Sequence, residues 1–135
     1  MQEERFKMEI VVRNSDLDDL NHVNNVRYVK WMEDVAKAHW FHLLEKNNLE
    51  NKYIWVVANH FVEYKRPALL DYKLSLETYL TGFEENHCYR MIEIKNAETG
   101  KIMIQSKSKW CYIDSKTNRP APIPDEILDL VGILV

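Results

Sequence analysis

Residues 13–28 read RNSDLDDLNHVNNVRY and separate an alternating apolar run from a long helical pattern. Within ten positions the stretch gathers three carboxylates, one imidazole and three amides. They belong to Asp16, Asp18, Asp19, His22, Asn21, Asn24 and Asn25. Asn24 and Asn25 suit a helix start, because their side-chain oxygens can accept hydrogen bonds from the unpaired N–H groups of a first turn. The stretch therefore predicts a strand, a polar loop and then a helix.

This polar loop has two interpretations. In the first it is only an acidic cap on a solvated loop, since the positive end of a helix dipole favours negative charge nearby. In the second the polar groups form a site at the helix N-terminus. We favour the second because so many different polar groups converge on a single helix start.

Length and composition narrow the class of protein. A chain of 135 residues with 46% hydrophobic residues predicts one folded domain, spanning residues 1–135, rather than a disordered segment. The net charge of −3 gives no electrostatic footprint for nucleic acid or for an anionic membrane. No apolar run approaches the ~20 residues needed to span a bilayer, and the first ten residues lack a signal-peptide core. We therefore expect neither a nucleic-acid nor a membrane partner.

The cysteines and histidines suggest no metal site. Cys88 and Cys111 lack a CxxC spacing, and we expect free thiols in a reducing cytoplasm. The five histidines are scattered, with no HxxxH or HxH pair. We expect no metal and no cofactor.

The periodicity along the chain predicts an α+β fold. Residues 26–44 carry apolar side chains at helical spacing around about half of the circumference, which indicates a largely enclosed helix. Alternating or β-branched runs predict strands at 5–13, 53–64, 71–81, 87–95 and 101–113, with a turn or bulge at Gly82 and a polar loop at 45–52. A short helix is expected from Pro124 through Leu130. One helix beside a run of strands favours an antiparallel sheet over a doubly wound one.

This order of elements, with the string DLDDLNHVNN at 16–25 followed by Tyr28, resembles the hotdog-fold thioesterases of the 4-hydroxybenzoyl-CoA thioesterase-like superfamily. The string is most similar to the DxDxxGHVNNxxY branch of bacterial acyl-CoA thioesterases and plant acyl-ACP thioesterases. Two weaker signals, EYKRP at 63–67 and RPAPIP at 119–124, follow in the expected order. Asn21 replaces the usual glycine, and asparagine tolerates left-handed backbone well. Leu20 stands where the plant enzymes carry an asparagine, so their Asn and His roles do not transfer cleanly.

The resemblance implies a role for each matching residue. Asp18 resembles the catalytic carboxylate, acting as general base or nucleophile, and the backbone N–H of Asn25 would polarise the thioester carbonyl. Thioester hydrolysis needs such an activated nucleophile and such donors, and helix N-termini supply free N–H groups. His22 has two readings, as a second acid/base or carbonyl donor and as a brace whose imidazole hydrogen-bonds the loop backbone. Asp16 and Asp19 are interpreted as mainly structural or solvated.

Together these features predict a single hotdog domain, an antiparallel sheet of about five strands wrapped around the helix at 26–44. The implied function is hydrolysis of an acyl-CoA or acyl-ACP thioester. Exposed sheet edges are usually protected, and the resemblance implies a homodimer or homotetramer with the acyl site between subunits. Two alternatives stay open: a non-catalytic acyl- or CoA-binding module, and a purely structural domain in which the polar loop is a helix cap.

Overall fold

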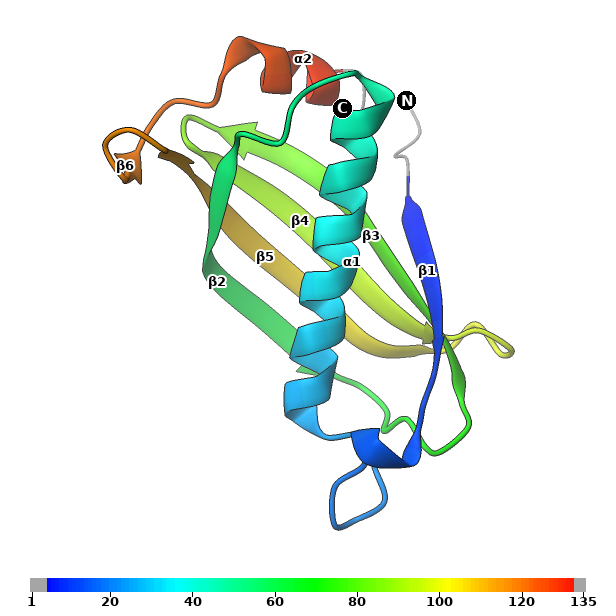
Figure 1. Ribbon diagram of the computed structural model, residues 1–135. Helices are drawn as coiled ribbons and strands as arrows, with labels where there is room; N and C mark the ends of the chain where they lie inside the picture. The colour runs from blue at the N-terminus through cyan, green and yellow to red at the C-terminus, as the bar shows by residue number, and fades with distance from the viewer. Residues whose placement is uncertain (1–4, 133–135) are drawn as a thin grey trace.

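The computed structural model describes residues 5–132, which form one long helix lying across a curved antiparallel sheet (Figure 1). The elements in chain order are β1 Phe6–Val11, the 3-10 turn η1 Asn14–Asp16, α1 Asn25–Lys46, β2 Ile54–Tyr64, β3 Lys73–Glu84, β4 His87–Asn96, β5 Ile102–Asp114, β6 Arg119–Pro120 and α2 Asp125–Gly132. This arrangement confirms the predicted α+β fold with about five strands around one long helix.

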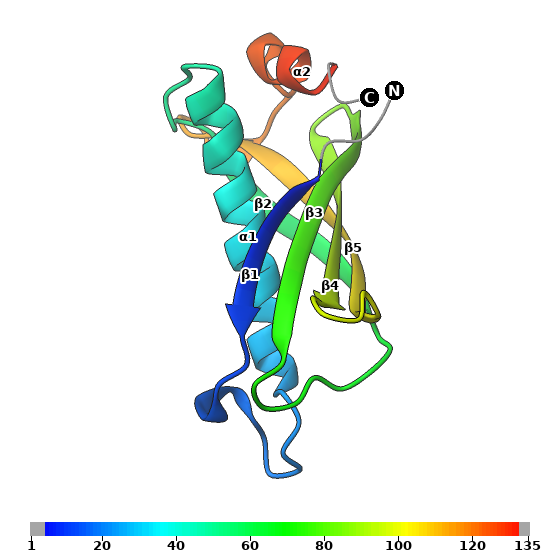
Figure 2. The same ribbon diagram turned by 90° about the vertical axis from the view of Figure 1, so that its right-hand side faces the viewer.

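The strand order shows how the chain closes around α1. The sheet runs β1-β3-β4-β5-β2, with all pairs antiparallel and the two-residue β6 added to β5. β1 and β2 are therefore the two edges of the main path, although only α1 and its loops lie between them in sequence. Figure 2 shows α1 on one side of the sheet, with β1 and β3 crossing in front of it.

α1 is held by the apolar face that its sequence predicts. Its buried side chains are Tyr28, Trp31, Met32, Val35, Ala36, His39, Leu43 and Leu44. The helix runs two residues beyond the predicted end at 44, because Asn47 caps it: its side-chain amide donates to the Leu43 carbonyl at 2.8 Å. Within residues 5–132, no helix combines the length and apolar composition that crossing a bilayer requires.

β3 is longer than predicted, because Gly82 lies within the strand. The register with β4 shifts between Leu80 and Gly82, so the glycine marks a bulge rather than a turn. The chain reverses after Glu84, where Glu85 takes a positive φ of 50°. The alternation predicted for β3 is confirmed, since the side chains facing α1 are buried. These are Leu74, Leu76, Thr78 and Leu80.

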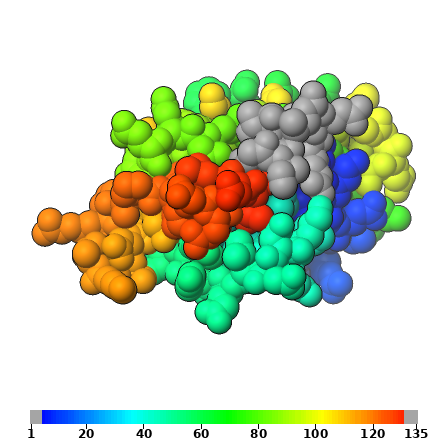
Figure 3. All heavy atoms as spheres, turned by 90° about the horizontal axis from the view of Figure 1, so that it is seen from above, coloured from blue at the N-terminus to red at the C-terminus, as the bar shows by residue number. Residues whose placement is uncertain are grey.

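α2 closes one end of the molecule. Figure 3, viewed from above, shows it seated between the C-terminal end of α1 and the β3–β4 turn. Ile123, Ile127 and Leu130 join Leu43 and Leu44 in a second apolar cluster there. The Tyr53 hydroxyl donates to Glu126 at 3.0 Å, which ties α2 to the start of β2.

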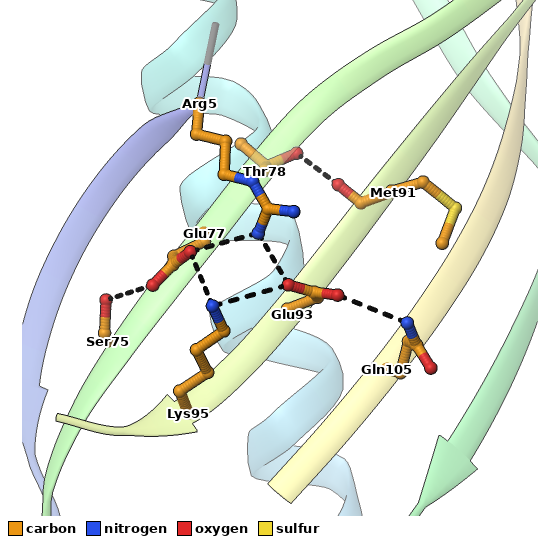
Figure 4. Close-up of polar contacts among 8 residues, drawn as sticks. All are labelled: Arg5, Ser75, Glu77, Thr78, Met91, Glu93, Lys95 and Gln105. Carbon is orange, nitrogen blue, oxygen red and sulfur yellow. Dashed lines mark hydrogen bonds and ion pairs between the residues drawn. The ribbon is translucent and has the colours of Figure 1, made fainter. Parts of the chain in front are cut away.

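The sheet face turned away from α1 carries a charged network (Figure 4). Glu77 and Glu93 are both buried, and one Arg5 nitrogen contacts them at 3.2 and 2.6 Å. Lys95 lies 3.2 Å from Glu77 and 3.7 Å from Glu93. Burial raises the pKa of Glu77, but Lys95, Ser75 and Arg5 outweigh that effect and hold it below its usual range.

The face turned toward α1 buries a cation, the guanidinium of Arg90 on β4. One of its nitrogens, Nη1, lies 2.9 Å from His39 Nδ1 and donates to Thr78 Oγ1 at 2.8 Å. Burial and the nearby charge of Arg90 lower the pKa of His39 to about 3. His39 is therefore neutral at physiological pH, and its Nδ1 accepts the hydrogen bond from Arg90.

We expect this buried histidine to make stability depend on pH. An unfolded chain protonates His39 near pH 6.5, whereas the folded chain resists protonation down to about pH 3. The contribution of neutral His39 to the free energy of unfolding is therefore fully present above pH 6.5. It is lost as the pH falls toward 3, at about 1.4 kcal/mol per pH unit. Replacing His39→Asn keeps an acceptor for Arg90 but removes the titration, so urea unfolding between pH 6.5 and 4 should show a slope lower by about one proton.

His42→Asn provides the control, because it changes an exposed histidine of the same helix and leaves the contact with Arg90 in place. It removes only the smallest of the three effects that lower the pKa of His39, after burial and Arg90. Equal slopes for wild type and His39→Asn would contradict a buried neutral histidine.

Candidate active site

The polar stretch between β1 and α1 forms a small hairpin. Leu17 and Val23 pair as an isolated antiparallel bridge, and the Asn24 N–H donates to the Asp16 carbonyl at 2.9 Å. Asn21 has a φ of 60°, as expected for the residue that replaces the family glycine. The hairpin projects past the end of the sheet, beside the N-terminal end of α1 (Figures 1 and 2).

Asp16 anchors this hairpin to its surroundings. Its Oδ2 accepts the Arg13 N–H at 2.8 Å, and its Oδ1 lies 3.0 Å from Arg27 Nε on α1. The side chain is buried, so both carboxylate oxygens are engaged in holding the loop. Asp19 is exposed, and its side chain makes no hydrogen bond or ion pair with the described residues. These positions fit the structural or solvated roles expected for both residues.

Asp18 lies in the exposed part of the hairpin, where its carboxylate orients its own turn. Oδ1 accepts the backbone N–H groups of Leu20 at 2.9 Å and of His22 at 3.2 Å. Oδ2 has no hydrogen-bond partner among the residues that the structure describes. The carboxylate is thus held in one orientation by two donors while one oxygen stays available.

His22 faces Asp18 across the hairpin through its backbone. The Asp18 N–H donates to the His22 carbonyl at 2.8 Å, opposite the bond from the His22 N–H to Asp18 Oδ1. The imidazole is half-buried and makes no hydrogen bond within residues 5–132. The backbone of His22 therefore holds the loop, and its ring nitrogens make no hydrogen bond to the loop.

The first turn of α1 supplies an unpaired donor. Asn24 is the N-cap, with Oδ1 accepting the Val26 N–H at 2.9 Å, as the sequence predicts. The Asn24 carbonyl accepts from Arg27 and Tyr28. The N–H of Asn25 has no partner in the described chain, and it lies at the positive end of the helix dipole.

A second loop packs against the hairpin and α1. The Ala68 N–H donates to the Tyr28 hydroxyl at 2.9 Å, and the Ala68 carbonyl accepts the Val23 N–H at 3.1 Å. Burial, with smaller effects from the hydroxyl of Tyr64 and the charge of Asp18, raises the pKa of Tyr28. The segment that follows EYKRP therefore packs against the same hairpin and helix start. The negative charge of Asp18 is close enough to Tyr28 to affect the pKa of its hydroxyl.

The structure brings only part of the predicted set together. Asp18 and His22 are in direct contact, whereas Asn25 lies beyond the hairpin and no described hydrogen bond joins it to Asp18. The structure has a cavity of about 550 Å³ beside Asp16 and one of about 220 Å³ further along α1. None of these three residues lines either of the two cavities. In one chain the predicted site is thus an open surface.

Sequence reasoning missed two features of the structure. The contact between Tyr28 and Ala68 gave no signal in sequence, because it joins residues 40 positions apart. The buried Arg90 did give one: it alternates with Ile92 and Ile94 on an apolar strand face, where a charge is unexpected.

The comparisons with known proteins agree with this fold. The family model of the thioesterase-like superfamily matches residues 12–131. The chain belongs to this superfamily. It is 26% identical over 134 residues to the long-chain acyl-CoA thioesterase FadM of Escherichia coli, covering 96% of this chain and 99% of FadM.

Solved structures share the hotdog fold. A predicted thioesterase from Bacillus stearothermophilus superimposes with a TM-score of 0.84 at 22% identity, covering 98% of this chain and 97% of that one. The Staphylococcus aureus protein SAV2348, solved in complex with CoA, gives a TM-score of 0.84 at 16% identity, over 99% and 85% of the chains. Family membership and similarity to an acyl-CoA thioesterase support thioester hydrolysis as the activity.

Among residues 5–132, no group of three or more His, Cys, Asp or Glu side chains is placed to hold a metal ion.

Proposed function

We propose that this protein hydrolyses acyl-CoA thioesters to the free acid and coenzyme A, with Asp18 as the catalytic carboxylate. The observation that carries the proposal is the fixed carboxylate of Asp18, held by two N–H groups with one oxygen available, in the hairpin that leads to the free N–H of Asn25. CoA is favoured over acyl carrier protein because FadM is an acyl-CoA thioesterase and SAV2348 binds CoA. Acyl carrier protein is the alternative carrier.

The proposed chemistry uses these groups at the carbonyl. As general base, Asp18 takes a proton from a water whose oxygen attacks the carbonyl carbon; the C–S bond then breaks, and the thiolate leaves and is protonated. As nucleophile, Asp18 attacks the carbon itself, the C–S bond breaks, and the thiolate leaves and is protonated. Water then hydrolyses the mixed anhydride to the free acid and restores the Asp18 carboxylate. In both routes the Asn25 N–H stabilises the charge that develops on the carbonyl oxygen, and the free His22 ring supports it.

We further propose that the site is completed by a second copy of the chain along β2. This edge strand exposes large apolar side chains, with Phe61 at 67% exposure and Tyr64 at 49%. Antiparallel pairing of two β2 strands brings the Tyr64 end of one strand to the Ile54 end of the other. Because Tyr64 packs on Tyr28, the partner then covers the open surface beside Asp18. A dimer of such dimers would give a tetramer.

We also propose that the protein is located in the cytoplasm. Cys88 and Cys111 are free and buried, which fits the reducing cytoplasm.

Replacing Asp18→Asn is the decisive test. The amide keeps an oxygen for the Leu20 and His22 N–H groups but loses the charge and basicity. We expect kcat on an acyl-CoA panel to fall by roughly 10²–10⁴-fold, with the affinity for a non-hydrolysable thioester analogue little changed.

Asp19→Asn is the matched control, since it removes a neighbouring exposed carboxylate that makes no hydrogen bond or ion pair with the described residues. If Asp18 is only a cap, Asp18→Asn should hydrolyse normally and lose about 1 kcal/mol of stability. A wild-type protein that binds the analogue without turnover would instead identify a non-catalytic acyl-binding module.

Replacing His22→Ala tests the imidazole separately. The hairpin should survive, because the loop contacts of His22 come from its backbone. If the ring helps to polarise the carbonyl, kcat should fall by roughly 10–10³-fold while the melting temperature stays near that of wild type. An unchanged kcat would remove His22 from the mechanism.

Light scattering at micromolar concentration tests the assembly. We expect a species of at least twice the 16.1 kDa chain mass. Phe61→Lys, which places a charge on the exposed edge, should shift it toward monomer and lower activity together. Leu128→Lys on α2, also an exposed apolar position, should change neither. A fully active monomer would exclude a site shared between subunits.

A further inference from the structure

A cavity of about 220 Å³ lies between the C-terminal half of α1 and the sheet. Its wall is aromatic and aliphatic, with Trp40, Trp55, Trp110 and Leu80, and it includes Arg90. At a rise of 1.5 Å per residue, the 15 helical steps from Asn25 to Trp40 amount to roughly 22 Å. Within one chain this cavity is therefore separate from the Asp18 hairpin.

Arg90 is a buried cation with no anionic partner. Its Nη1 contacts only neutral groups, the Nδ1 of His39 and the hydroxyl of Thr78. Nε and Nη2 make no hydrogen bond with the described residues. The adjacent thiol of Cys88 gives no counter-charge, because burial raises its pKa to about 12.

The carboxylates of the neighbouring strands do not compensate this charge. Glu77 and Glu93 lie on the opposite face of the sheet, where Arg5 and Lys95 engage them (Figure 4). None of the described residues that line the cavity is acidic, and Lys37 adds a second cation to its wall. A buried guanidinium is costly unless it is paired, and a planar carboxylate is its best-matched partner.

The rest of the wall suits the apolar body of such a ligand. The indole rings of Trp40, Trp55 and Trp110 line the cavity, and their faces suit an apolar ring or chain. The volume of about 220 Å³ lies a little below the roughly 300–1,000 Å³ of pockets that hold drug-sized ligands. That space suits one ring or a short alkyl chain.

We infer that this cavity binds a small monocarboxylate, with its carboxylate on Arg90 and its ring or short chain among the indole rings. The site uses no residue of the proposed catalytic set and does not rest on the proposed function.

Intrinsic fluorescence can detect this binding directly, because three of the four tryptophans line the cavity. The probes are benzoate and straight-chain carboxylates of four to ten carbons, compared with the primary amide and alcohol of the best chain length. We expect a saturable signal, with the carboxylate bound at least tenfold more tightly than its amide or alcohol. Equal affinities, or no saturable signal for any acid, would overturn the inference.

A designed pair of variants tests the role of the charge. Leu80 lies directly opposite Arg90 in the β3–β4 register and lines the same cavity, so Leu80→Glu supplies an internal carboxylate beside the guanidinium. It should lower carboxylate affinity at least tenfold relative to Leu80→Gln, which has the same shape without the charge. Equal affinities for these two variants would exclude Arg90 as the anchor.

Arg90→Gln should lower carboxylate affinity at least tenfold and leave alcohol affinity within about twofold. The Leu80 pair provides the test if Arg90→Gln does not fold. Arg119→Gln also removes one arginine charge, but from the exposed surface, and this variant should bind the carboxylate as wild type does. Asp18→Asn should also bind the carboxylate normally, which keeps this site distinguishable from the proposed catalytic one.

Discussion

Burial of one face of α1 against the sheet is the interaction on which the rest of the structure depends. Eight side chains of the helix are buried, and they fix where its N-terminus lies relative to the strand ends. The hairpin at 16–24 and the loop after Tyr64 then meet at that terminus, through Asp16 with Arg27 and through Tyr28 with Ala68. A polar site can be exposed and still ordered here because an apolar helix positions it.

The surface that buries α1 is not uniform. Near the N-terminal half of the helix it is made of aliphatic residues such as Leu74, Ile94 and Ile104. Toward the C-terminal half it changes to Arg90, Ser108 and Trp110, and here the cavity opens. Polar groups in a core cost stability unless each has a partner. This half of the interface is therefore packed less tightly by apolar groups, and it is the half in which we place the inferred ligand.

Patterns that act locally were readable from sequence. The N-cap at Asn24, the left-handed Asn21 and the alternation of β3 each depend on neighbouring residues, and all were predicted. The end of α1 was not, because a side-chain cap decides it. At Gly82 the sequence left a turn and a bulge as alternatives, and the register shift between β3 and β4 decides for the bulge. The contact between Tyr28 and Ala68 joins distant segments, and no single-sequence pattern encodes it.

The strand order also bears on how the chain folds. β3, β4 and β5 are joined by short turns, so they can pair soon after local structure forms. β1 must wait for a partner far along the chain, since Phe6 lies opposite Thr78, and β2 must reach past the meander to β5. Closing such long loops costs entropy before their contacts form. The central meander should therefore form the nucleus, with the two edge strands and α1 joining late.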